Sequence, residues 1–108
     1  MTISPCPHLG GDVGETDERE RHIGERHPDL LPVHRSRIAE VLAYPDEVRH
    51  SRRFGQARLF SRWFADIRRG KHVVVVVVST AEVGGRHWII TAYLARALAE
   101  GAVEWKRG

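Results

Sequence analysis

Six consecutive valines, Val73 to Val78, constrain this chain of 108 residues more than any other segment. Valine branches at Cβ and fits a strand better than a helix. Because the run offers neither face of that strand to water, we expect a central strand covered on both sides. Turn residues follow and precede it, at Gly84-Gly85 and Arg69-Gly70, and predict that its neighbours join it by hairpins in an antiparallel meander.

Other strands are expected where short β-rich runs are separated by turn residues. The expected strands are Glu47 to Arg52, Ala57 to Phe64, Lys71 to Ser79, Arg86 to Tyr93 and Val103 to Trp105, with a helical turn over Leu94 to Glu100. Strict alternation along the fourth strand places two groups on opposite faces. One face takes His87, Ile89, Thr91 and Tyr93; the other, expected to face the core, takes Trp88, Ile90, Ala92 and Leu94.

Two helices are expected before the sheet. Asp17 and Glu20 form a capping-box pattern that predicts a short polar helix from Glu18 to about Arg26. A second helix is expected after Leu31, ending near Tyr44 before Pro45, with its apolar face at Ile38, Val41 and Leu42. The predicted class is therefore α+β, with N-terminal helices packed on a four- to five-stranded antiparallel sheet.

Domain organisation and compartment follow from length and composition. The size suits one domain, expected over residues 17 to 108, while residues 1 to 16 contain prolines and glycines without apolar periodicity and predict a flexible lead-in. The longest apolar run is too short for a membrane span, and the N-terminus shows no signal segment. Cys6 is the only cysteine, so no internal disulfide can form. We expect a cytoplasmic protein that does not bind membranes.

Charge is distributed unevenly along the chain. Residues 1 to 48 carry five arginines against ten acidic side chains, whereas residues 49 to 108 carry twelve Lys and Arg against four acids. Such a basic half can neutralise phosphates, which makes RNA or DNA the expected partner, although a solvated arginine-rich surface would look the same. Eight of its cations stand close together: Arg49, Arg52, Arg53, Arg58, Arg62, Arg68, Arg69 and Lys71.

Two histidines in the first helix, His22 and His27, are candidates for proton transfer. Imidazole can accept and donate a proton near neutral pH, as RNA cleavage through the 2'-hydroxyl requires. The plainer alternative is equally open: His27 would cap the helix C-terminus before Pro28, and His22 would simply be exposed.

Hydroxyl and guanidinium groups on the expected strands could hold a phosphate. Thr91 and Tyr93 could donate hydrogen bonds to it, and Arg58 or Arg62 could neutralise developing charge. Thr and Tyr are also good strand formers that need no function at a half-buried sheet surface.

Metal and nucleotide chemistry find little support. Cys6, His8, His22, His27 and His34 lie in the first third of the chain, but their spacings match no standard zinc motif. Neither Gly10-Gly11 nor Gly84-Gly85 has the strand-then-helix setting of a phosphate-binding loop. We expect no metal and no cofactor.

The order of several segments is similar to that of a known nuclease group. The segments are HIGERHPDL, IAEVLAYPDEV, RLFSRWF, VVVVVV, IITAYLA and Gly101 to Trp105. Together, from about His22 to Trp105, they resemble the phage-associated barnase-EndoU-colicin-RelE-like nucleases of the BECR fold, which are small RNases.

The resemblance implies metal-independent attack of a ribose 2'-hydroxyl on the adjacent phosphate. By position, His22 and His27 match the helical histidines of that group, Arg58 or Arg62 its strand arginine, and Thr91 with Tyr93 its late hydroxyls.

We therefore expect an endoribonuclease with catalytic side chains at these six positions and RNA contacts by Arg49, Arg52, Arg53, Arg68, Arg69 and Lys71. A small RNase would harm its host, so a toxin controlled by a small acidic antitoxin protein is the expected setting. A non-catalytic module binding RNA or protein through the basic sheet is the alternative, and self-association into a homo-oligomer stays open.

Overall fold

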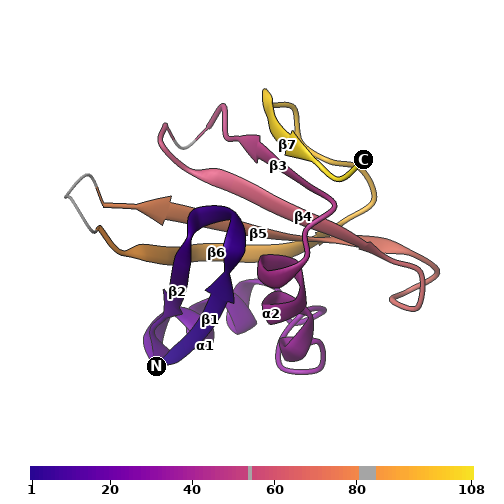
Figure 1. Cartoon of the computed structure of the whole chain (residues 1–108). Coiled ribbons are helices and arrows are strands. Elements are labelled where there is room, and N and C mark those ends of the chain that lie inside the picture. Colours follow the sequence, from indigo (N-terminus) through magenta and orange to yellow (C-terminus); the bar gives the residue numbers. More distant parts are fainter. Residues whose placement is uncertain (54, 81–84) are drawn as a thin grey trace.

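The computed structural model describes residues 1–53, 55–80 and 85–108 as an α+β fold with two helices and a seven-stranded mixed sheet (Figure 1). The strands are β1 (Thr2–Cys6), β2 (Gly11–Glu15), β3 (Glu47–His50), β4 (Arg58–Phe64), β5 (Lys71–Ser79), β6 (His87–Ala95) and β7 (Val103–Lys106). The helices are α1 (Asp17–Arg26) and α2 (Arg35–Ala43), and a short 3-10 helix, η1 (Pro7–Leu9), joins β1 to β2. The strand order is β1-β2-β6-β5-β4-β3-β7.

The valine strand is central, as expected. β5 pairs antiparallel with β4 on one side and with β6 on the other. Val73, Val75 and Val77 pack into one apolar cluster, while Val74 and Val76 belong to a second cluster on the opposite face. The predicted turn at Arg69-Gly70 is present with positive φ angles of 66° and 104°. Of the other predicted turn, Gly84 lies outside the described residues.

The N-terminal residues correct two expectations. Instead of a flexible lead-in, they form the β1–β2 hairpin, and β2 joins the sheet by pairing parallel with β6 at Val13 and Gly14. Cys6 and Val13 are buried in the first cluster, which supplies the apolar anchors that alternation did not reveal. The sheet is therefore larger than four or five strands, and mixed rather than antiparallel.

Helix α1 begins one residue earlier than its predicted capping box implied. Its N-cap is Thr16, whose side-chain oxygen accepts a hydrogen bond from the Arg19 backbone N–H at 3.1 Å. Ile23 is its buried anchor. Strand β2 pairs with β6 at only two positions, which leaves the rest of that edge of β6 free. Helix α1 follows β2 in the chain and contacts β6 along this edge.

Helix α2 covers one face of the sheet. Its buried residues Ile38, Val41 and Leu42 are the predicted ones, and the helix contacts β1, β4 and β5. The opposite face carries the second cluster, with Leu98 from the segment after β6 packed against it. That segment is not the predicted helical turn, because β6 continues to Ala95 and the chain then crosses to β7, which pairs with β3. No helix of the described residues is long and apolar enough to cross a membrane.

A bulge in β6 overturns the predicted division of its faces. Val76 pairs with Thr91 but Val77 pairs with Ile89, so Ile90 is an extra residue in β6. Ile89 and Ala92 consequently pack in the first cluster, on the side of α2, whereas Ile90 and Tyr93 pack against the second. Ile90 was predicted to face the same core as Ala92, and strict alternation fails because an inserted residue shifts the period of two.

Candidate functional site

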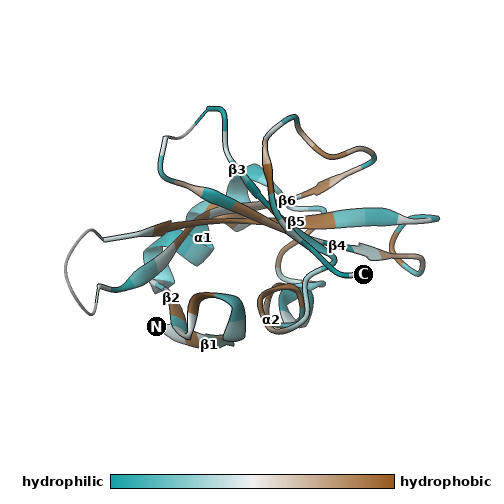
Figure 2. Cartoon of the chain, turned by 45° about the horizontal axis from the view of Figure 1, so that its top comes forward, coloured by the Kyte–Doolittle hydropathy of each residue, from teal (hydrophilic) through white to brown (hydrophobic). Residues whose placement is uncertain are grey.

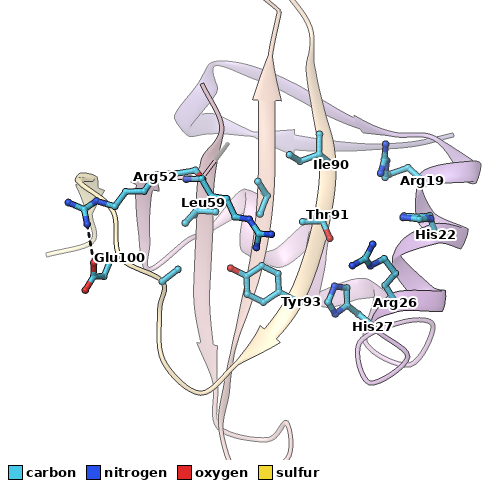
Figure 3. A pocket seen from close by; sticks show the side chains of 14 residues that line it. Arg19, His22, Arg26, His27, Arg52, Leu59, Ile90, Thr91, Tyr93 and Glu100 are labelled. Carbon is cyan, nitrogen blue, oxygen red and sulfur yellow. Dashed lines mark hydrogen bonds and ion pairs between the residues drawn. The ribbon is translucent and has the colours of Figure 1, made fainter. Parts of the chain in front are cut away.

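Helix α2 covers one face of the sheet (Figure 2), and a pocket of about 660 Å³ lies on the opposite face (Figure 3). Its floor comes from β4, β5 and β6, through Leu59, Val76, Ile90, Thr91 and Tyr93. Helix α1 forms one wall, and the segments around Arg52 and Glu100 form the other. The apolar floor with polar walls is suited to a ligand that is partly aromatic and partly charged.

The α1 wall consists of Arg19, His22, Arg26 and His27. Residues three and four apart share one face of a helix, so the spacing of the first three turns them to the same side. Figure 3 shows these side chains on the side of α1 that faces Thr91 and Tyr93. His27 is also the C-cap residue, with its backbone N–H donating to the Ile23 carbonyl at 2.7 Å. The predicted capping role and a place in the pocket are therefore compatible.

The arginine and histidine side chains of this wall have no acidic partner among the described residues. No hydrogen bond or ion pair joins the side chains of Arg19, His22 or Arg26 to another described residue. On the solvent side of the same helix, by contrast, Arg21 pairs with Glu25 at 2.6 Å. Guanidinium groups left without partners beside a pocket favour an anionic ligand.

Tyr93 and His27 approach each other across the pocket. Their ring centroids are 6.0 Å apart at an interplanar angle of 38°. Partial burial raises the pKa of Tyr93 above its ordinary value of 10, so its hydroxyl stays protonated and can donate a hydrogen bond at neutral pH. Thr91 opens onto the same pocket because it alternates in register with Tyr93, opposite Val76 and Val74. The structure thus brings His22, His27, Thr91 and Tyr93 together, as predicted.

The opposite wall contains a paired arginine. Arg52 lies 3.0 Å from Glu100, the one carboxylate among the described lining residues. Arg53 also lines the pocket, so Arg52 and Arg53 are the predicted RNA-contacting residues that the structure places there. Four arginines against one carboxylate leave the lining strongly positive.

The predicted strand arginines lie elsewhere. Arg58 bonds both oxygens of Glu104 at 3.0 Å, and Arg62 donates to the Tyr44 carbonyl at 3.3 Å while lying over the Phe64 ring. Residues 58, 60, 62 and 64 share one face of a strand, and Phe60 and Phe64 belong to the cluster covered by α2. Both arginines therefore lie on the face opposite to that of Thr91 and Tyr93, and the structure does not bring them into this pocket.

The remaining predicted RNA contacts are outside the pocket. Arg49 pairs with Glu47 at 3.1 Å and donates to the Ala99 carbonyl at 2.9 Å, so it holds the segment after β6 onto the sheet. Arg68, Arg69 and Lys71 belong to the β4–β5 turn and the start of β5.

Arg19 and Arg26 were missed among the candidates. A signal for them exists in the sequence: they stand three before and four after His22, on the same helical face.

Comparison with protein-family models, curated proteins and solved structures finds no match to this chain. Among the described residues, no group of three or more His, Cys, Asp or Glu side chains could hold a metal ion.

Proposed function

We propose that this protein is an endoribonuclease. The pocket between α1 and β6, lined by His22, His27, Thr91 and Tyr93 and called the α1–β6 pocket below, would cleave RNA by attack of the ribose 2'-hydroxyl. One observation carries the proposal: two imidazoles, two guanidinium groups without partners and a protonated tyrosine hydroxyl line one pocket. Proton transfer and phosphate neutralisation are the two tasks of this reaction, and these are the groups that perform them.

In the proposed reaction, one of His22 and His27 takes the proton from the ribose 2'-oxygen, which forms a bond to the adjacent phosphorus. The bond from phosphorus to the 5'-oxygen breaks, and the other histidine gives that oxygen a proton. The products are a 2',3'-cyclic phosphate and a free 5'-hydroxyl. Arg19 and Arg26 neutralise the phosphate, and Tyr93 donates a hydrogen bond to a non-bridging oxygen. Thr91 orients the same phosphate.

The biological setting is proposed on the same basis. An intracellular RNase with an open, positively charged pocket has to be restrained, and a small acidic antitoxin protein that covers the pocket would do so by charge complementarity. This part rests on the pocket's charge together with the resemblance to toxin-type nucleases. Its first test is whether expression of the chain alone stops growth and whether a short acidic partner restores it.

The decisive experiment compares cleavage with binding. His27→Ala should lower the cleavage rate of total RNA, assayed with excess chelator, by about 100-fold or more, because one proton-transfer group is lost. Binding of a 2'-deoxy analogue should change by no more than a few fold. Arg26→Ala should weaken both. His34→Ala, which alters a histidine outside the pocket, is the control and should change neither.

Two outcomes would contradict the proposal. Equal cleavage by the wild type, His22→Ala and His27→Ala would remove the histidines from the reaction. Salt-dependent binding without any cleavage between pH 5 and 9 would replace the enzyme by a non-catalytic RNA-binding module, which makes the same charge prediction.

A further inference from the structure

A second group of side chains on the pocket face combines an exposed aromatic ring with unpaired cations. Trp63, at the end of β4, is 45 % exposed, and its ring centroid lies 4.9 Å from that of His72. Arg68, Arg69 and Lys71 follow in the β4–β5 turn, which projects at one end of the sheet (Figure 1).

The indole of Trp63 is held in a fixed position. A Cβ at Gly70 would come within 2.3 Å of its ring, so the indole lies directly over the glycine backbone. His72 meets it edge-on, at an interplanar angle of 68°. An aromatic side chain that is already ordered loses little conformational freedom when a flat ligand stacks on it. The open part of the ring is therefore a preformed stacking surface.

The turn beside it presents positive charge. Neither Arg68 nor Arg69 makes a side-chain hydrogen bond or ion pair with another described residue, and both side chains are exposed. Lys71 donates to the carbonyls of Arg68 and Gly70, which keeps its ammonium group at the turn. Arg68 and Arg69 have positive φ angles of 44° and 66°, and both are exposed in this tight turn.

The register places this group on the same face as the pocket. Trp63 pairs with His72 on the neighbouring strand. His72 and Val74 are two residues apart and share one face, and Val74 pairs with Tyr93 of the pocket. Two residues along a strand correspond to about 7 Å. The indole and the pocket thus lie on one face, within the span of a few nucleotides.

We propose that Trp63, with Arg68, Arg69 and Lys71, is a second nucleotide subsite that stacks a base of single-stranded RNA. The subsite rests on the proposed function in that it extends the substrate bound at the α1–β6 pocket. Base stacking on an aromatic ring combined with cations along the backbone is a general mode of single-strand binding. The ligand is a nucleotide several positions away from the one in the pocket, so only an RNA longer than a dinucleotide reaches both.

The test compares two lengths of fluorescently labelled oligodeoxyuridylate, a dimer and an octamer, which lack the 2'-hydroxyl and cannot be cleaved. Trp63→Ala should weaken octamer binding by about 5-fold or more and leave the dimer unchanged. Trp63→Phe, which keeps a ring, should recover most of the affinity. Trp105→Ala, a control of similar exposure at 39 % in β7, should bind both lengths like the wild type.

Arg69→Gly supplies an independent measurement, because glycine suits the positive φ and only the charge is lost. It should reduce the salt dependence of octamer binding by about 0.7 in the log–log slope. If Trp63→Ala folds and binds the octamer as tightly as the wild type, or if the slope of Arg69→Gly is unchanged, the subsite is overturned. Failure of the proposed function looks different: RNA would stay uncleaved while the octamer still depended on Trp63.

Discussion

Histidine and arginine side chains gather in two regions of this molecule. Around Glu104, His8 lies at 2.5 Å, His50 at 2.9 Å and Arg58 at 3.0 Å from the carboxylate. Around the α1–β6 pocket, Arg19, His22 and Arg26 have no such partner among the described residues.

The first region joins four parts of the chain that are distant in sequence. His8 belongs to η1, His50 to β3, Arg58 to β4 and Glu104 to β7, so the carboxylate ties the N-terminal hairpin to the far edge of the sheet. Its histidine and arginine side chains already share a carboxylate partner within the fold. Comparison of the two regions shows that residue type alone does not distinguish a candidate binding site from a structural ion pair. The presence or absence of a carboxylate partner makes the distinction.

Glu15, like Glu104, lies outside the pocket, but its carboxylate is not fully partnered. Its substitution should have the largest effect on stability. Only 4 % of this residue is exposed, and its Oε2 atom has no hydrogen-bond partner among the described residues. Burial, with a smaller contribution from the nearby Glu20 charge, raises the pKa of Glu15 from 4.5 to about 7 against the opposing effect of Arg35. The native state therefore keeps a proton that the unfolded chain loses at lower pH.

The sign of the effect follows from this raised pKa. The contribution of Glu15 to stability is greatest below pH 4.5 and falls as the pH rises to about 7, by up to about 3 kcal/mol in total. Glu15→Gln, which imitates the neutral acid, should raise the free energy of unfolding by up to that amount at pH 8 and by little at pH 5. Urea unfolding at both pH values checks this. A variant no more stable than the wild type at pH 8 would show that Glu15 is charged without cost.

Removing the carboxylate of Glu104, which His8, His50 and Arg58 share, should have the next largest effect on stability. Glu104→Ala leaves Arg58, His8 and His50 without their shared partner, and we expect a loss of about 2 kcal/mol in the free energy of unfolding at pH 7. Burial alone would raise the pKa of Glu104, but hydrogen bonds from His8 and Arg58 lower it on balance. Its stabilisation is therefore present above pH 4.5 and is lost as the pH falls through the lowered pKa.

The matched control comes from the pocket. The double variant Arg19→Ala and Arg26→Ala removes two cations whose side chains form no hydrogen bond or ion pair with another described residue, so stability should stay within about 0.5 kcal/mol of the wild type. Chemical denaturation of the two variants side by side measures the contrast. Equal destabilisation would mean that the two regions do not differ in the way described.

How far the sequence predicts this structure depends on the kind of pattern. The valine strand, its hairpin turn at Arg69-Gly70 and the apolar face of α2 follow from local propensity and periodicity, and they are found where expected. The β1–β2 hairpin was missed because its place in the fold depends on distant residues: β2 pairs with β6, and Cys6 and Val13 are buried against elements far along the chain.

The candidate site was predicted in part for a related reason. His22, His27, Thr91 and Tyr93 reach one pocket because α1 follows the edge of β6, while the bulge adds Ile90 to the floor beside Thr91. Neither the parallel pairing nor the bulge leaves a mark in the alternation of residues. Arg58 and Arg62 were assigned to the site on charge and on their position in the resemblance, but whether their strand face is the one that carries Thr91 and Tyr93 depends on register.

The smallest expected effect concerns the one place where the two regions resemble each other, the pair between Arg52 and Glu100 at the pocket wall. Both side chains are well exposed, at 74 % and 87 %, so the pair contributes at most about 1 kcal/mol and competes weakly with a phosphate for Arg52. Glu100→Gln should therefore tighten binding of an uncleavable octamer by no more than about 5-fold, with the larger gain at low salt. Glu25→Gln, which frees Arg21 on the solvent side of α1, is the control and should tighten binding less, because Arg21 does not line this pocket. Equal gains from both variants would show that the octamer responds to net charge alone, and a loss of affinity in Glu100→Gln would show that the carboxylate holds Arg52 in its binding position.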